Sequence, residues 1–131
     1  MEMLTEIRFL LNFKMDSYSP MGLIIIGQSE LREALKKPAY HAIAGRVELR
    51  CHLPPFARAQ TVDYIACHLK YAGSEKQLFT ENAISAIYDF SGGIARKINR
   101  ICNICLIYAA KNNKNAIDEK MTADMIECEF A

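Results

Sequence analysis

Ser91-Gly92-Gly93-Ile94-Ala95-Arg96-Lys97-Ile98-Asn99-Arg100 is the stretch where two helical patterns meet, and the rest of the chain is organised around it. Upstream, Thr80 to Phe90 carries apolar side chains at helical spacing, which predicts a short amphipathic helix. Glycine readily adopts the left-handed conformation found just after a helix end, so Gly92-Gly93 is expected to end that helix. A second helix is predicted from about Ile94 to about Lys111.

Arg96 falls in the first turn of this second helix, three residues after Gly93. A cation at this position opposes the helix dipole, because the N-terminal end of a helix carries partial positive charge. Two interpretations are open. Arg96 is a solvated arginine with no special role, or it reaches an anion outside its own helix, such as a nucleotide phosphate.

The composition is that of an ordinary globular protein, with 51% hydrophobic and 24% charged residues in a chain of 131. The net charge of +1 gives no broad electrostatic case for binding nucleic acid or an anionic membrane. The longest apolar run, Ile104 to Ala110, is too short to cross a bilayer, and no signal-peptide pattern is visible. Five cysteines at scattered spacing do not indicate a disulfide scaffold, so a cytoplasmic location is expected.

Cys102-Asn103-Ile104-Cys105 has the CxxC spacing of some metal sites. On a helix both cysteines lie on the face that carries Ile98 and Ile101, so two buried, small hydrophobic side chains are expected. A zinc site needs a second pair of ligands, and the pairs Cys51-His52 and Cys67-His68 do not supply a recognisable spacing. No metal site is predicted.

The N-terminal part of the chain reads as an incomplete α/β layer. An amphipathic helix is predicted from Glu2 to about Lys14. The β-branched run Gly22 to Gly27, bounded by glycines, indicates a strand buried on both faces. Ligands of open α/β sheets bind at the carboxyl ends of strands, and this end delivers Gln28. Gln28 is therefore a candidate polar contact, or simply a turn residue.

Two short helices and a second strand are expected next. Ser29 is a favourable N-cap for a helix over Glu30 to Lys37, and Pro38 begins another over Pro38 to about Ala44. Arg46 follows, and the alternation of apolar and polar residues from Val47 to Leu53 predicts a strand.

Pro54-Pro55 ends this strand and has the character of a hinge between subdomains. Everything after it is predicted to be helical: Arg58 to Ala72, Thr80 to Phe90, Ile94 to Lys111, and a last helix capped by Thr122. The expected fold class is α/β, mostly helical overall, with two parallel-type strands and their helices in residues 1–55. An all-α subdomain is expected over residues 56–131.

Taken together, four sequence segments resemble the C-terminal half of an AAA+ ATPase module of the general secretion pathway protein A (ExeA/GspA) type. Kin of this type include transposition helper ATPases. The segments are spread over nearly the whole chain. They are Ile7-Arg-Phe-Leu-Leu-Asn-Phe13, Leu23-Ile-Ile-Ile-Gly-Gln-Ser-Glu-Leu-Arg32, Arg50-Cys-His-Leu-Pro-Pro55 and Ser91-Gly-Gly-Ile-Ala-Arg-Lys-Ile-Asn99.

The resemblance implies roles for three residues. Gln28 falls at the sensor-1 position, which orients the attacking water near the γ-phosphate. Arg46 falls where the family places an arginine finger for ATP bound in a neighbouring subunit, with Arg50 and Arg32 as nearby alternatives. Arg96 falls at sensor 2, the lid arginine that touches the phosphates. A guanidinium suits both cationic roles, because phosphoryl transfer needs positioning and neutralisation of spread negative charge.

The sequence also departs from the family. It contains no GxxxxGK[ST] and no apolar run that ends in Asp-Glu, so the phosphate-cradling loop and the Mg²⁺ carboxylate are missing. The resemblance thus implies a fragment that works with ATP and Mg²⁺ only in the complete parent protein, and no tight nucleotide binding by this chain alone. Implied partners are its own missing N-terminal half, further copies in a homo-oligomer, and secretion machinery or a transposition complex. A helical interaction module with no nucleotide role is the alternative.

In the implied fold, the strand that leads into the P-loop lies between the two predicted strands, and it is not in this chain. We therefore expect Gly22–Gly27 and Val47–Leu53 to pair with each other or with a strand of another copy.

Overall fold

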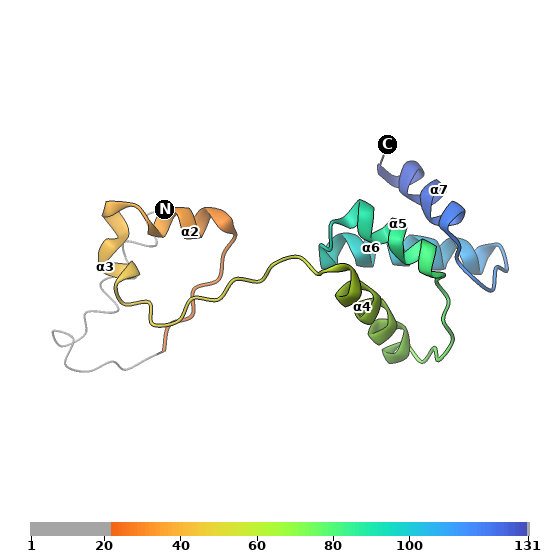
Figure 1. The fold of residues 1–131 in the computed structure, drawn as a ribbon, viewed down its shortest axis with the longest axis horizontal. Coiled ribbons are helices and arrows are strands. Elements are labelled where there is room, and N and C mark those ends of the chain that lie inside the picture. The colour runs from red at the N-terminus through yellow and green to blue at the C-terminus, as the bar shows by residue number, and fades with distance from the viewer. Residues whose placement is uncertain (1–21, 131) are drawn as a thin grey trace. The chain divides into compact units, whose positions relative to one another are not determined.

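The computed structural model describes residues 22–130, and for Phe130 it describes the backbone only. The described residues divide into two compact units, with the boundary between His52 and Leu53. The helices are α2 (Ser29–Leu35), the 3-10 helix η2 (Pro38–Tyr40), α3 (His41–Ala44), α4 (Arg58–Tyr71), α5 (Glu81–Ser91), α6 (Ala95–Lys111) and α7 (Glu119–Phe130) (Figure 1). The helix predicted over Glu2 to Lys14 lies outside the described residues.

The first unit is built on α2, η2 and α3, which enclose a small core of Ala34, Tyr40 and Ile43. The helix predicted from Glu30 to Lys37 is present, but its N-cap is Gln28 instead of Ser29. The second short helix begins as 3-10 turn at Pro38, whose fixed φ suits the first position of a helix.

The two predicted strands are wrong for the described part of the chain. Residues 22–28 and 48–57 form neither helix nor strand, and no ladder of hydrogen bonds joins them to any described residue. Ile24 and Ile26 are 84% and 90% exposed, and Leu49 is 80% exposed. A strand exists only when a partner backbone satisfies its N–H and C=O groups, and none of residues 22–130 supplies one. The described fold is therefore helical, and the α/β assignment is corrected.

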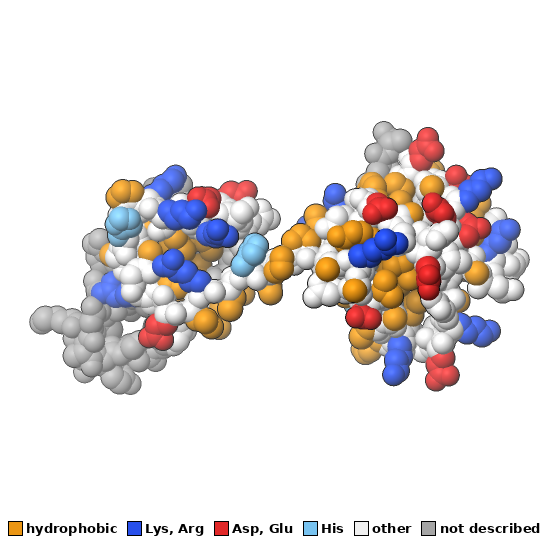
Figure 2. Space-filling model, viewed as in Figure 1, with side chains coloured by type: hydrophobic (Ala, Val, Ile, Leu, Met, Phe, Trp, Pro, Cys, Tyr) orange, Lys and Arg blue, Asp and Glu red, His pale blue; other side chains and the backbone are white. Residues whose placement is uncertain are grey.

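The second unit is a bundle of four helices, α4 to α7, as its amphipathic patterns predicted. Its core is a single cluster of buried side chains, drawn from all of these helices except α7 and from the loops between them: Ile65, Phe79, Ala83, Ile84, Ile87, Ile98, Ile101, Cys105, Ala109 and Ile117. Partly buried residues of α7, such as Met121, Met125 and Ile126, pack against this cluster. Figure 2 shows hydrophobic and charged side chains interspersed on the visible face of this unit.

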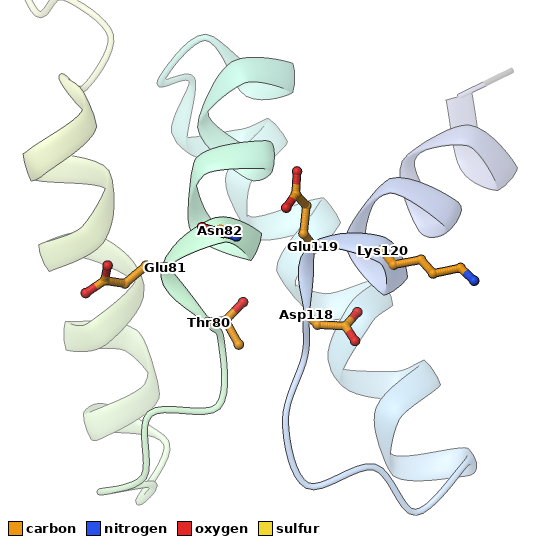
Figure 3. A pocket seen from close by; sticks show the side chains of 6 residues that line it. All are labelled: Thr80, Glu81, Asn82, Asp118, Glu119 and Lys120. Carbon is orange, nitrogen blue, oxygen red and sulfur yellow. The ribbon is translucent and has the colours of Figure 1, made fainter.

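Two loops of the bundle are tied together beside α5 and α7. Ile117 donates its N–H to the Leu78 carbonyl at 2.8 Å, and Thr80 donates to the Ile117 carbonyl at 3.0 Å. Phe79 and Ile117 are each 1% exposed, so both side chains turn into the bundle. The pairing places the N-termini of α5 and α7 next to each other (Figure 3).

The caps of the two neighbouring helices α5 and α7 compare differently with the sequence. Thr80 caps α5, since its hydroxyl accepts from the Ala83 N–H at 3.2 Å. The last helix was predicted to be capped by Thr122, but it begins at Glu119. Asp118 is its cap: one carboxylate oxygen accepts from the Met121 N–H at 2.8 Å. Thr122 is fully buried and donates its hydroxyl to the Asp118 carbonyl.

Candidate functional site

The turn Ser91-Gly92-Gly93 between α5 and α6 contains two glycines with positive φ. Gly92 has φ of +59°, the left-handed conformation expected of a residue that follows a helix end, and its N–H bonds the Tyr88 carbonyl at 2.8 Å. Nothing lies within 4 Å of the place where a Cβ would stand on Gly92. This first glycine is thus required by backbone conformation alone.

Ser91 organises the inside of the turn. It is 1% exposed, and its hydroxyl accepts the Gly93 N–H at 3.2 Å while it faces the Tyr88 carbonyl at 3.4 Å. A buried N–H without an acceptor would cost free energy, so this hydroxyl satisfies a group that the helix ladder does not reach.

Gly93 is buried with φ of +75°, and it differs from Gly92 in what it touches. Its carbonyl accepts the Phe56 N–H at 2.9 Å. A Cβ on Gly93 would lie far inside van der Waals distance of the Phe56 carbonyl oxygen and within 2.9 Å of the Phe56 nitrogen. The second glycine is therefore required by the close approach of a chain segment from before α4.

Arg96 is the second residue of α6 and is exposed. The helix cap, Ile94, offers no side-chain hydrogen bond, and the first turn holds no acidic residue. The N–H groups of Ala95 and Arg96 have no intrahelical acceptor, as at every helix start. Within residues 22–130, no hydrogen bond or ion pair engages the Arg96 guanidinium. The turn presents a cation and unpaired N–H donors together, an arrangement that suits an anion.

The neighbouring cations of α6 are engaged within the bundle. The ammonium group of Lys97 lies 5.6 Å from the centre of the Phe90 ring, a cation–π contact. Arg100 forms an ion pair with Glu129 of α7. Arg96 thus differs from both neighbours in its surroundings, although all three lie in the first two turns.

The other predicted site residues belong to the first unit. Gln28 is exposed, and its carbonyl accepts the Leu31 N–H at 3.0 Å while its side chain makes no capping hydrogen bond. Arg46 is exposed, and one guanidinium nitrogen lies 3.4 Å from the Ala42 carbonyl. Arg50 donates to the Ala44 carbonyl at 3.0 Å, and Arg32 lies in the last turn of α2. The roles of Gln28, Arg46 and Arg96 stay predictions.

A shallow hollow of about 440 Å³ lies between the N-termini of α5 and α7 (Figure 3). Its lining is Thr80, Glu81, Asn82, Asp118, Glu119 and Lys120. The Thr80 and Asp118 side chains serve as helix caps, and Figure 3 shows Glu81 and Lys120 directed away from one another. No group of three potential metal ligands occurs in the described part of the chain.

Of the two cysteines predicted to be buried, Cys105 is buried and Cys102 is partly buried. Cys105 is fully buried and Cys102 packs against the same core. Burial raises the pKa of the Cys102 thiol to about 12, with the nearby Cys105 thiol as a lesser cause. Burial also raises the pKa of Cys105, and a hydrogen bond with Thr122 partly opposes this effect. Protonated thiols are poor ligands and poor nucleophiles.

Phe56 is the residue at this site that sequence patterns did not reveal. It lies in an irregular segment, and no spacing relates it to Gly93. The one signal in the sequence was the second glycine. Gly92 alone accounts for the helix end, so a glycine at position 93 indicates a further requirement, such as the close approach of another backbone segment.

The chain is 33% identical over 114 residues to General secretion pathway protein A of Aeromonas hydrophila. The match covers 87% of this chain and 21% of that protein, so the chain spans about a fifth of the length of the curated relative it matches. No protein-family model matches the chain, and neither does any solved structure. None of the helices in residues 22–130 has the length and hydrophobicity needed to span a bilayer.

Proposed function

We propose that this chain is the sensor and lid part of an ATPase of the AAA+ type, related to General secretion pathway protein A. In the complete protein it contributes Arg96 to the phosphates of bound ATP. The observation that carries the proposal is the Ser91-Gly92-Gly93 turn, after which α6 begins with an exposed Arg96 that has no hydrogen-bond or ion-pair partner within residues 22–130. The similarity to the Aeromonas protein supports the same assignment.

The chemistry of the turn fits an anionic ligand. A guanidinium donates several hydrogen bonds in a fixed plane and keeps its charge at any physiological pH, which suits phosphate oxygens. Unpaired N–H groups at a helix start add donors that need no rearrangement. The sequence holds no phosphate-cradling loop and no Mg²⁺ carboxylate, so both belong to the remainder of the complete protein.

Gln28 and Arg46 take further roles in this proposal. Gln28 orients the attacking water, and Arg46 acts on ATP held by a neighbouring copy, with Arg50 and Arg32 as alternatives for the finger. Such a finger requires a homo-oligomer. The proposed outcome of ATP turnover is the assembly or remodelling of secretion machinery in the cytoplasm.

A hybrid protein tests the proposal. This chain replaces the matching segment of the Aeromonas protein, and ATP hydrolysis is measured by phosphate release. Arg96→Ala is expected to abolish most of the turnover, whereas Lys97→Ala, the adjacent cation held over Phe90, is expected to retain it. If a hybrid that hydrolyses ATP is indifferent to Arg96→Ala, the chain is better described as a helical interaction module with no nucleotide role.

Subunit mixing separates the two arginines. Arg46→Ala subunits mixed with subunits defective in the P-loop should regain activity, because each supplies what the other lacks. Arg96→Ala subunits in the same mixture should regain none, since Arg96 acts on nucleotide in its own subunit. Finger arginines contribute roughly 10³ to 10⁵ in rate in related enzymes, so partial recovery is readily measured. Equal behaviour of the two variants contradicts the assignment.

A further inference from the structure

We infer that Phe56 is a positioning residue for Arg96: its backbone is fastened to Gly93, and this contact sets where α6 begins. The contact between Phe56 and Gly93 is called the latch below. The inference rests on the proposed function of Arg96 and adds the means by which its place is controlled.

The latch joins two segments that are far apart in the sequence. The Phe56 N–H donates to the Gly93 carbonyl at 2.9 Å, and there is no room for a side chain on Gly93. On the other side of the same residue, the Gly93 N–H donates to the Ser91 hydroxyl. Both polar groups of Gly93 are therefore fixed, and three residues later the chain reaches Arg96.

Phe56 is itself held in place by α4. Its ring lies 4.9 Å from the ring of Tyr64, which lies 4.4 Å from that of His68. The next residue, Ala57, donates its N–H to Gln60 Oε1 at 2.9 Å and caps the start of α4. A segment fixed on both sides transmits a displacement of α4 to the turn instead of absorbing it.

The segment on the N-terminal side of the latch is different. Pro54 and Pro55 have no N–H, and the Leu53 N–H has no backbone acceptor among the described residues. Leu53 is also 93% exposed. The first hydrogen bond that the connecting segment makes with the bundle is therefore the one to Gly93. This bond gives a displacement of residues 53–55 a direct route to the start of α6.

Hydrogen exchange of the full 131-residue chain tests the latch itself. The Phe56 amide is expected to exchange as slowly as the core amides of α5, while the Leu53 amide exchanges freely. Gly93→Ala forces the Phe56 carbonyl away, so Phe56 exchange should accelerate by about tenfold or more relative to the α5 amides. Gly92→Ala is the matched control, because it brings the same left-handed strain without the collision and should leave Phe56 protected.

The effect on Arg96 has its own readout, the NMR signal of its guanidinium Nε–H. We expect Gly93→Ala to shift this signal and Gly92→Ala to leave it in place. Titration with inorganic tripolyphosphate, the probe for the phosphate role, should move the Arg96 signal weakly in the wild-type chain. The affinity of the chain for tripolyphosphate should fall on the order of tenfold in Gly93→Ala, which is the size of effect found between coupled residues. If Phe56 had a merely structural role, the affinity for tripolyphosphate would not change.

A second pair of variants covers the case in which Gly93→Ala does not fold. Phe56→Pro removes the N–H donor, whereas Phe56→Ala keeps it and removes the ring. Loss of the wild-type Arg96 signal in Phe56→Pro but not in Phe56→Ala supports the latch. Free exchange at Phe56 in the wild-type chain, or an unchanged Arg96 signal in Phe56→Pro, overturns it. If the latch variants move the Arg96 signal but tripolyphosphate does not, the latch stands and the phosphate role of Arg96 is overturned.

Discussion

At the residue scale, two adjacent glycines serve two different physical needs. Gly92 has open space around it and is required by its positive φ, whereas Gly93 is required by its positive φ and by the Phe56 backbone that packs on it. Ser91 completes the turn by accepting the Gly93 N–H. The order Ser-Gly-Gly is thus explained by a hydroxyl that satisfies a buried amide, a left-handed helix cap and a close backbone approach, in that sequence.

Ser91→Ala is expected to destabilise the bundle by about 1–2 kcal/mol, because the buried Gly93 N–H loses its acceptor. Urea denaturation followed by circular dichroism measures the change. Ser74→Ala is the control: the Ser74 hydroxyl makes only an exposed 3.4 Å contact with the Lys76 carbonyl, so its loss should cost less than about 0.5 kcal/mol. Equal effects of the two substitutions would show that the hydroxyl in the turn is dispensable.

The cysteines should differ sharply in reactivity. At pH 8, iodoacetamide is expected to modify the exposed Cys51, Cys67 and Cys128 quickly, and Cys102 and Cys105 only after unfolding. Mass spectrometry of the alkylated chain gives the order of modification. Rapid alkylation of Cys102 in the folded chain would contradict its burial.

The same burial has a consequence for stability at high pH. The Cys102 thiol has a pKa of about 12 in the folded chain against an ordinary 9.0, so the folded state keeps a proton that the unfolded state releases. This contribution to stability is fully present below about pH 9 and is lost as the pH rises toward 12. Cys102→Ala should weaken the decline in that window.

At the element scale, two helices of the bundle begin where a side chain satisfies one of their first N–H groups. Thr80 does this for α5 and Asp118 for α7. The predicted cap at Thr122 was wrong because the Asp118 carboxylate accepts the Met121 N–H, so the helix starts at Glu119, four residues earlier than a cap at Thr122 implies. Thr122 then lies inside the helix with its hydroxyl bonded to the Asp118 carbonyl.

Asp118→Ala is therefore expected to cost about 1 kcal/mol, the usual value for a lost N-cap. Asp118→Asn keeps an acceptor at the same place and should restore most of the loss. Thermal denaturation of the three chains makes the comparison. Glu119→Ala is a suitable control, since Glu119 is exposed and has no capping bond among the described residues.

At the scale of the whole molecule, the two units differ in how much they bury. The second unit has one continuous core, while the described part of the first, residues 22–52, has three buried residues and exposes several large apolar side chains: Ile24, Ile26 and Leu49. A fragment of residues 53–131 is therefore expected to keep its helical circular dichroism and melt within a few degrees of the full chain. A fragment of residues 22–52 should not melt cooperatively, because so small a core rarely offsets the conformational entropy. The reverse result would place the stability of the chain in its first unit.

The 131-residue chain alone is expected to hydrolyse ATP no faster than buffer. The P-loop and the Mg²⁺ carboxylate, which this sequence lacks, supply most of the acceleration in such enzymes. A phosphate-release assay on the purified chain provides the measurement. Turnover that disappears in Arg96→Ala would show that the chain holds a complete active site, contrary to this prediction.

The sequence by itself determined the helices of the second unit, since an amphipathic helix satisfies its own backbone and shows its buried face through local spacing. It also located the helix end at Gly92, the place of Arg96 in the first turn of α6, and the burial of Cys105. Each of these follows from residues within a few positions of one another.

Only the tertiary structure decided the remainder. Gly22–Gly27 and Val47–Leu53 have strand-like composition, but a strand needs a partner backbone, and none of the described residues provides one. The start of α7 depended on which of two side chains reaches an N–H, a matter of geometry and not of residue type. The contact between Phe56 and Gly93 joins segments with no shared pattern, because a backbone-to-backbone approach leaves no mark in the sequence except the glycine that permits it.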